Sequence, residues 1–339
     1  MTDWLAPFLE ARDEGLYAPA FEAYVDPPAP VPRAILSHAH SDHAVDGHGE
    51  IWSTAETLAL YRRRHPEWSG LSRALGYGEP VESGGVTVRL HSAGHVLGSA
   101  QLRFGSAESE ESLLYTGDFK RRLSRTAAPA ETPAAGTLVT ETTFGLPVFR
   151  FPGRAELERR LVAACRDAFA QEKTPVLLAY ALGKAQEAAA ILTEAGIPTV
   201  LHGAAWKLLP DFTAAGVALP LSRPYDSGPP SAGEALVVPP HCARTPVVQK
   251  IKKRLVVYLS GWAIREAARA DVDADVLLPF SDHADFPDLL RHAGEVRARR
   301  VVTVHGFARD FARILEARGT PALALAQRML ERGSEDAAP

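Results

Sequence analysis

Cysteine is scarce in this sequence, which contains only Cys165 and Cys242 among its 339 residues. Two cysteines cannot form the network of disulfides that stabilises many small secreted proteins, and they cannot form a thiolate-rich metal site. Any metal bound by this chain must therefore be held by histidine and carboxylate side chains.

Long apolar runs are lacking too. The longest stretches, such as PVLLAYALG at residues 175–183, are too short to span a bilayer. The first residues, MTDWLAPFLEARDEG, carry acids where a signal peptide would carry a basic stretch and a long apolar core. We therefore expect a cytoplasmic protein that does not associate with membranes.

An excess of positive charge is also missing, because the formal net charge is −4 at pH 7. A generally cationic surface is the usual electrostatic sign of a nucleic-acid-binding protein, and this chain does not have that composition. Local basic clusters could supply a smaller binding surface, although each also fits a solvated helix face or strand end. These clusters are KIKKR at 250–254, KRRLSR at 120–125 and RARR at 297–300.

The apolar residues, 46% of the chain, follow different patterns in its successive parts. Up to about residue 150, short β-like runs such as GVTVRLHSA and TLVTETTFG alternate with turns rich in glycine and proline, which predicts a sheet-rich segment. From about residue 153, amphipathic helices alternate with apolar strands, which indicates an α/β unit with a parallel sheet. Strand and helix patterns return at the end of the chain, and residues 220–235 are expected to form a linker or long loop.

The stretch ILSHAHSDHAVDG at residues 35–47 places three histidines and an aspartate directly behind an apolar run. His38 and His40 are two residues apart at the end of a predicted strand, so their side chains leave the same face and can converge on one ion. Asp42 and His43 follow in the turn, where they can reach a second ion. Imidazole suits zinc, and a carboxylate tolerates a harder metal such as manganese. The competing interpretation is a polar loop that happens to be rich in histidine.

Further possible metal ligands lie just beyond other apolar strands, namely His95, Asp118 and His305. Each of them precedes or faces a turn that contains glycine. Taken alone, a histidine or aspartate at a strand end is more often a cap or a hydrogen-bonded polar residue. Their occurrence together with the histidine-rich loop favours one shared metal site.

Six motifs in this order resemble a known family. They are the HxHxDH loop, AGHVLGSA, TGD, ETTFG at 141–145, SDHADF at 281–286 and VHG at 304–306. Together they resemble the metallo-β-lactamase fold and, within it, the nucleic-acid-processing β-CASP group. Segments such as GLYAPAF, ETTFGLPVFRF and SGWA are most similar to the bacterial DNA-ligase-associated exonucleases. RNase J and the nuclease of mRNA 3′-end formation are further relatives that this pattern resembles.

The resemblance implies the domain organisation. Residues 1–150 and 272–339 would form an αββα metallo-β-lactamase sandwich, and residues 151–271 would form an inserted α/β cap, the β-CASP domain. The fold class would be α/β, with the metal site in the cleft between the two domains.

The resemblance also implies a site for two divalent ions, zinc or manganese. One ion would be held by His38, His40 and His95, the other by Asp42, His43 and His305, and Asp118 would bridge the two. Two such ions can activate a water molecule and neutralise a phosphate. The activated water then hydrolyses the phosphodiester, and no protein nucleophile is needed. His305 matters for classification, because the Artemis-like relatives lack a histidine at this position.

Two further residues match catalytic positions of the family. His283 in SDHADF would stabilise the transition state or protonate the departing oxygen, which an imidazole can do near neutral pH. Glu141 in ETTFG would orient a ligand or His283 without binding metal itself. Asp26 matches an aspartate that supports the metal loop, although it also fits a turn residue before Pro27.

Two turns in the predicted cap fit phosphate binding. Gly183 lets the backbone turn closely after a strand, and Lys184 opens a helix whose free N–H groups attract anions. Ser260 and Gly261 repeat this arrangement after another strand. Such turns occur in every α/β protein, so only the two together indicate a path for a sugar–phosphate backbone.

We therefore predict a metal-dependent exonuclease that acts on single-stranded DNA ends in DNA repair, with 5′→3′ polarity favoured and a functional link to an ATP-dependent DNA ligase. RNA is the main competing substrate, because nothing recognisable in the chain reads or excludes a 2′-hydroxyl. A glyoxalase-like hydrolase of small molecules would share the HxHxDH loop, but it would need neither His283 nor so long an insertion. A catalytically inactive binding subunit of a processing complex would typically lack metal ligands, whereas this chain retains all of those proposed above.

Overall fold

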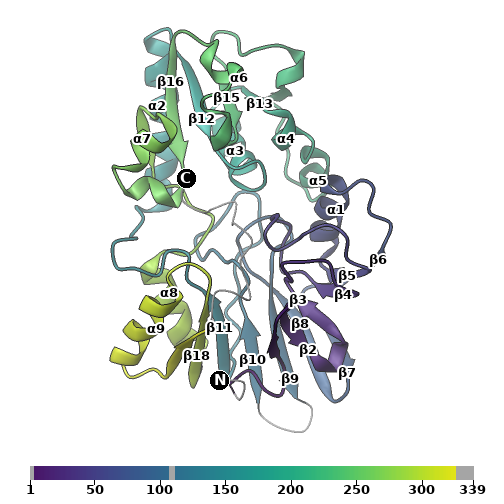
Figure 1. Ribbon diagram of the computed structural model, residues 1–339. Coiled ribbons are helices and arrows are strands. Elements are labelled where there is room, and N and C mark those ends of the chain that lie inside the picture. Colours follow the sequence, from purple (N-terminus) through teal and green to yellow (C-terminus); the bar gives the residue numbers. More distant parts are fainter. Residues whose placement is uncertain (1–3, 107–110, 326–339) are drawn as a thin grey trace. The chain divides into compact units, whose positions relative to one another are not determined.

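The computed structural model describes residues 4–106 and 111–325, which form two compact units. The second unit comprises residues 124–126 and 150–282, and the first unit comprises the remaining described residues (Figure 1). The chain returns to the first unit after residue 282, later than the predicted boundary at 271/272. The reason is strand β17 (Val276–Leu278), which pairs in parallel with β16 (Arg254–Leu259) of the second unit.

Two sheets, called sheet A and sheet B, make up most of the first unit. Sheet A has the order β1 (Glu10–Arg12), β2 (Gly15–Ala18), β3 (Ala23–Val25), β4 (Arg33–Ile35), β5 (Glu50–Ser53), β6 (Leu71–Ala74). Sheet B has the order β19 (Ala322–Ala324), β18 (Arg300–Val304), β11 (Thr137–Glu141), β10 (Ser112–Tyr115), β9 (Ala100–Ser106), β8 (Val86–Ser92), β7 (Pro80–Ser83). The two β-like runs quoted from this part of the sequence, GVTVRLHSA and TLVTETTFG, contain β8 and β11.

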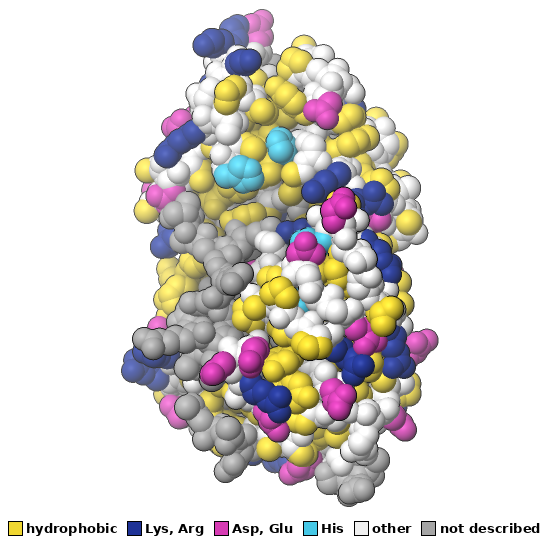
Figure 2. All heavy atoms as spheres, turned by 45° about the vertical axis from the view of Figure 1, so that its right-hand side comes forward, with side chains coloured by type: hydrophobic (Ala, Val, Ile, Leu, Met, Phe, Trp, Pro, Cys, Tyr) yellow, Lys and Arg dark blue, Asp and Glu magenta, His cyan; other side chains and the backbone are white. Residues whose placement is uncertain are grey.

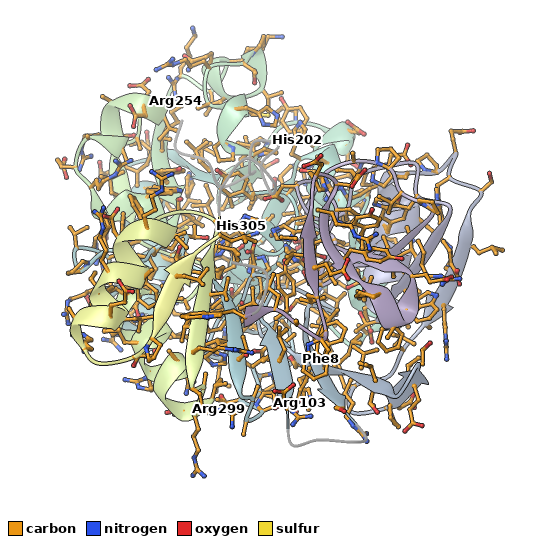
Figure 3. The ribbon with its side chains drawn as sticks, turned by 60° about the horizontal axis from the view of Figure 1, so that its bottom comes forward. Phe8, Arg103, His202, Arg254, Arg299 and His305 are labelled. Carbon is orange, nitrogen blue, oxygen red and sulfur yellow. The ribbon has the colours of Figure 1, made fainter. Side chains whose placement is uncertain are left out.

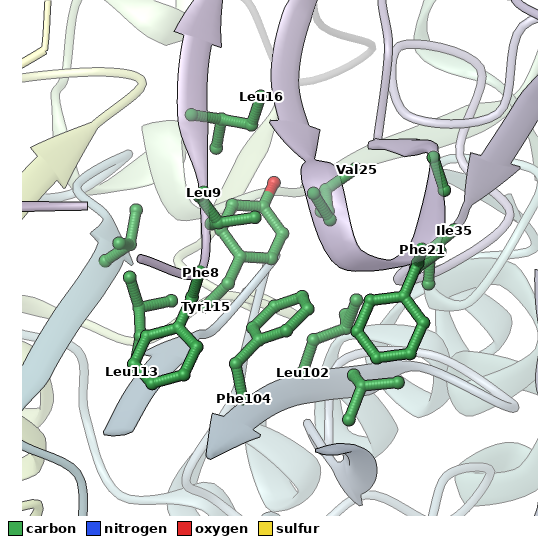
Figure 4. Packing of buried hydrophobic residues seen from close by; sticks show 14 of the residues in the cluster. Phe8, Leu9, Leu16, Phe21, Val25, Ile35, Leu102, Phe104, Leu113 and Tyr115 are labelled. Atoms are coloured by element: carbon green, nitrogen blue, oxygen red, sulfur yellow. The ribbon is translucent and has the colours of Figure 1, made fainter. Parts of the chain in front are cut away.

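The main apolar core of the first unit lies between the facing sides of these sheets (Figure 4). Sheet A contributes Val25 and Ile35, and sheet B contributes Leu113 and Tyr115. Leu114, between the last two, belongs to a different cluster on the opposite side of sheet B. This alternation follows from the two-residue period of a strand and lets β10 pack on both of its faces.

Helices cover the outer faces of both sheets. On sheet B, Phe286 of α8 (Phe286–Glu295) and Phe311 of α9 (Ala308–Ala317) pack in the cluster that contains Leu114. On sheet A, Leu58 of α1 (Ala55–Arg64) packs in the cluster with Ala34 and Ile51. The layers are therefore helix, sheet, sheet and helix, which confirms the predicted αββα sandwich.

The second unit is a parallel sheet, sheet C, with apolar clusters on both faces. Its order is β14 (Ser222–Pro224), β13 (Thr199–Leu201), β15 (Ala235–Val238), β12 (Thr174–Leu178), β16, β17. Its helices are α2 (Arg154–Ala170), α3 (Lys184–Glu194), α4 (Gly203–Trp206), α5 (Leu209–Ala214), α6 (Pro246–Gln249), α7 (Ala268–Val272). The predicted α/β class is confirmed. Across the described part of the chain, no helix has both the length and the apolarity needed to cross a membrane.

The segment at residues 220–235 is more ordered than the predicted linker. It contains strand β14, which pairs in parallel with β13 at the edge of sheet C. Pro224 ends this strand, and an edge position tolerates proline because its missing N–H is not needed by a second neighbour. The proline- and glycine-rich composition therefore reflects a short edge strand followed by a turn.

Buried His292 on α8 makes the stability of the first unit sensitive to pH. Burial, aided by the charge of Arg121, lowers the pKa of His292 to about 3. In the unfolded chain the imidazole takes up a proton near pH 6.5, whereas in the folded protein it stays neutral until much lower pH. The unfolding free energy should therefore fall as the pH drops below about 6.5.

We expect His292→Gln to reduce this loss of stability by about 2 kcal/mol between pH 7 and 5. Urea unfolding at the two pH values measures the difference, and His241→Gln, at an exposed position, serves as the control. If the unfolding free energy of His292→Gln depends on pH as that of the wild type does, the imidazole of His292 does not contribute to the loss of stability at low pH.

Candidate metal centre

The residues proposed as ligands gather at one edge of sheet B because of strand direction. β8 and β10 are each antiparallel to β9, and β10 and β18 are each parallel to β11, so β8, β10 and β18 all run the same way. His95, Asp118 and His305 follow the ends of these strands within three residues. These strand directions bring the three residues, which the sequence placed only at strand ends, to a common edge.

The first predicted ligand set is assembled. His38, His40, His95 and Asp118 are buried, and each offers an atom within 4.8 Å of the atoms offered by the others. Nε2 of His95 lies 3.0 Å from Nδ1 of His40, and Nε2 of His38 lies 3.6 Å from Oδ2 of Asp118. Nitrogen atoms from two loops thus converge beside one carboxylate.

The second predicted set lies next to the first, although it is not among the groups of described residues whose donor atoms all lie within 4.8 Å of one another. Nε2 of His43 is 3.4 Å from Oδ2 of Asp118 and 3.8 Å from Oδ2 of Asp42. The ring of His305, which lies at the end of β18 (Figure 3), is centred 5.3 Å from that of His43. One oxygen of Asp118 is therefore close to His38 and to His43, as a bridging ligand would be.

The donor chemistry fits a divalent cation. Among the described residues, Nε2 of His38 is buried and has no hydrogen-bond partner, while Nδ1 lies 2.9 Å from Oγ of Ser37. Burial and the neighbouring His43 lower the pKa of His38, so the imidazole is neutral and can bind metal. Burial alone would raise the pKa of Asp118, but His43 and His283 outweigh it and keep the carboxylate ionised.

Asp26 supports the histidine-rich loop from behind. Its carboxylate accepts hydrogen bonds from the backbone N–H of Ser37 (2.7 Å) and from the hydroxyl of Tyr115 (2.9 Å). It also lies 2.9 Å from Nδ1 of His43, which directs Nε2 of this imidazole toward Asp118. A carboxylate in this position orients a ligating histidine and makes it more basic. Ser37 and Tyr115 could not be recognised from the sequence, because their residue types are ordinary at strand ends.

Glu141 holds His283. Both oxygens of this buried carboxylate lie within 3.0 Å of Nδ1 of His283, and one of them accepts the N–H of Phe119 at 2.8 Å. Burial raises the pKa of Glu141, and the nearby His283 opposes this shift. The ring of His283 is centred 4.7 Å from that of His95. Nδ1 of His283 therefore faces Glu141, and the catalytic role of this histidine stays a prediction.

The proposed phosphate-binding residues lie beyond the ends of β12 and β16 in the second unit. They are Gly183, Lys184, Ser260 and Gly261. The ammonium group of buried Lys184 is 2.6 Å from Oδ1 of Asp282, and the N–H of Gly183 donates to Oε1 of Gln186. A phosphate would therefore have to compete with these internal partners, which lie too far away in the sequence or are too common in type to be predicted from it. The phosphate role stays a prediction.

Comparisons with known proteins find similar sequences whose names refer to nucleic-acid processing. It is 38% identical over 327 residues to a "Probable DNA ligase" of Opitutus terrae, a match that covers 96% of this chain and 32% of the relative. It is 30% identical over 193 residues to cleavage and polyadenylation specificity factor subunit 3 of Dictyostelium discoideum, covering 47% of this chain and 24% of the relative. The chain thus spans about a third or less of the length of these relatives.

A solved structure supports the fold. The crystal structure of a protein of unknown function from Enterococcus faecalis has a TM-score of 0.60 at 14% identity, over 87% of this chain and 79% of that chain. No family model matches the sequence. Together, the αββα layers and the sequence relatives confirm the predicted resemblance to the β-CASP group of the metallo-β-lactamase fold.

Proposed function

We propose that this protein is a metal-dependent nuclease that shortens single-stranded DNA from its ends. The observation that carries the proposal is the position of Asp118, whose Oδ2 lies 3.6 Å from His38 and 3.4 Å from His43. One histidine from each predicted ligand set thus lies close to the same carboxylate. Divalent ions bound there would activate water and neutralise a phosphate.

The chain's own residues supply positioning and proton transfer. Asp26 holds His43, so that its Nε2 faces Asp118 and Asp42. Glu141 holds Nδ1 of His283, so that Nε2 can give a proton to the departing oxygen. None of these side chains needs to form a covalent bond to the substrate.

Two observations bear on the substrate. In the relative named "Probable DNA ligase", the matching segment shares a polypeptide with the remaining two thirds of that protein, which favours DNA and a functional link to a ligase in repair. The relative named as a cleavage and polyadenylation factor favours RNA instead. We favour DNA as the substrate because the first match covers 96% of the chain and the second covers 47%.

The deciding assay measures cleavage of matched 5′- and 3′-end-labelled DNA and RNA strands and of a circular single-stranded DNA, in the presence of manganese or zinc. We expect linear DNA to be degraded from the 5′ end and the circle to stay intact. Protein treated with a chelator is the control. Cutting of the circle, or a strong preference for RNA, would overturn the DNA exonuclease proposal and leave the metal-dependent hydrolase standing.

Binding should weaken only modestly with salt. On the face drawn in Figure 2, basic and acidic side chains are interspersed, in keeping with the net charge of −4. Affinity for a single strand falls with salt in proportion to the number of phosphates contacted, so a slope equivalent to a few contacts is expected. Titrations of labelled DNA at several salt concentrations measure this slope.

A further inference from the structure

We propose that helix α1 and the turn after it set the affinity for the ion at His38, His40 and His95, by fixing the two loops that carry these ligands. We call Tyr61, Arg64, His65 and Trp68 the α1 clamp, and residues 38–48 the metal loop. This inference deepens the proposed function, because it assumes that the histidines bind metal.

The α1 clamp contacts the metal loop through backbone carbonyl groups. Arg64 donates from Nη1 to the carbonyl of Ala39, the residue between His38 and His40. The remaining contacts are Tyr61 Oη to the carbonyl of Val45 (3.0 Å), His65 Nε2 to that of Ala44 (3.2 Å) and Trp68 Nε1 to that of His48 (2.6 Å). Four side chains from one short segment thus bind carbonyls along the whole loop.

The metal loop needs such support because it lies beyond the sheet. Strand β4 ends at Ile35, and the local bonds of the loop include a turn in which the N–H groups of His43 and Ala44 reach the carbonyl of His40. A turn of this kind fixes neighbouring residues without fixing the loop against the rest of the domain. Asp26 holds the loop at His43, and the contacts from α1 fix it at Ala39, Ala44, Val45 and His48.

The other end of α1 holds the loop of His95. Oγ1 of Thr54, the N-cap of α1, and Oγ1 of Thr57 both donate to the carbonyl of Gly98, at 2.7 and 3.0 Å. Gly98 has φ +77°, and a Cβ there would lie 2.7 Å from the N atom of Thr57, so the loop sits directly against the helix. One rigid helix therefore connects the loop of His38 and His40 to the loop of His95.

The main test compares Arg64→Ala with Arg63→Ala, which removes the same charge from an exposed neighbouring position. Metal affinity is measured by competition with a chelating dye in the absence of nucleic acid, and unfolding is measured on the metal-free proteins. We expect Arg64→Ala to weaken binding of the ion at His38, His40 and His95 by about 10- to 100-fold. This is the usual effect of losing a group that orients metal ligands. Arg63→Ala should bind metal like the wild type.

Two nearly isosteric variants keep the test decisive if Arg64→Ala folds poorly. Tyr61→Phe removes one hydroxyl at the metal loop, and Thr57→Val removes one at the loop of His95. Both should weaken metal binding while the unfolding temperature of the metal-free protein changes little. If metal affinity is unchanged in all three variants while their unfolding temperatures fall, α1 stabilises the fold without affecting metal binding. That result would overturn the inference. A wild-type protein that binds metal but cuts no nucleic acid overturns only the proposed function.

Discussion

Replacing Asp118 by alanine should abolish phosphodiester hydrolysis and leave the protein with less than half of its bound metal. One oxygen of Asp118 lies within 4 Å of His38, His43 and His95, so this carboxylate is shared by both predicted ligand sets. Its negative charge would also offset the mutual repulsion of two divalent ions bound there. Wild-type protein purified without chelator should approach about two ions per chain, the stoichiometry of two-metal hydrolases.

Metal analysis and the end-labelled DNA assay on the same preparations test this prediction. Asp118→Asn keeps the shape of the side chain and removes its charge, and it should also lose metal and activity. Asp310→Ala, at an exposed position on α9, is the control for removing one aspartate. Full activity in Asp118→Ala would rule out this metal centre.

The ligand positions could be predicted because strand patterns and turn residues fix them locally. Each proposed ligand follows an apolar strand, and parallel directions bring the ends of β10 and β18 to one edge of sheet B. The layers were expected from the resemblance to the metallo-β-lactamase fold and not from the strand patterns. In the structure, Leu113 and Tyr115 pack on one face of β10 and Leu114 packs on the other.

Helix α1 was not predicted, and neither was its connection to the metal loop. Its contacts end on backbone carbonyls of Ala39, Ala44, Val45 and His48, and every residue type has a carbonyl. The residue types along the loop therefore hold no signal for the clamp. Only the three-dimensional position of α1 relates these distant groups.

The second unit differed from expectation where contacts join residues far apart in sequence. Lys184 and Asp282 are 98 residues apart and form a buried ion pair. A lysine at the start of a helix after a glycine indicates anion binding in the sequence, whereas its actual partner is an aspartate of this chain. The late return to the first unit has a similar origin, because β17 has only three residues and is recognised by its pairing with β16.

Replacing His283 by alanine should lower turnover by about 10²–10⁴-fold, the usual contribution of a general acid or base. Metal content should not change, since Nδ1 of His283 is held by Glu141 and its proposed role is to protonate the departing oxygen. Glu141→Gln should have a smaller effect on turnover, because the amide oxygen can still accept a hydrogen bond from Nδ1. Turnover at saturating substrate and metal content per chain are measured together.

Exposed His241 supplies the control, and His241→Ala should keep both turnover and metal. The separation between turnover and metal content is what identifies His283 as a proton donor. A ligand behaves differently, because removing it lowers both quantities together, as expected for Asp118. Parallel loss of metal in His283→Ala would therefore move His283 into the ligand set, together with His95, whose ring is centred 4.7 Å away. It would also leave the departing oxygen without an assigned proton donor.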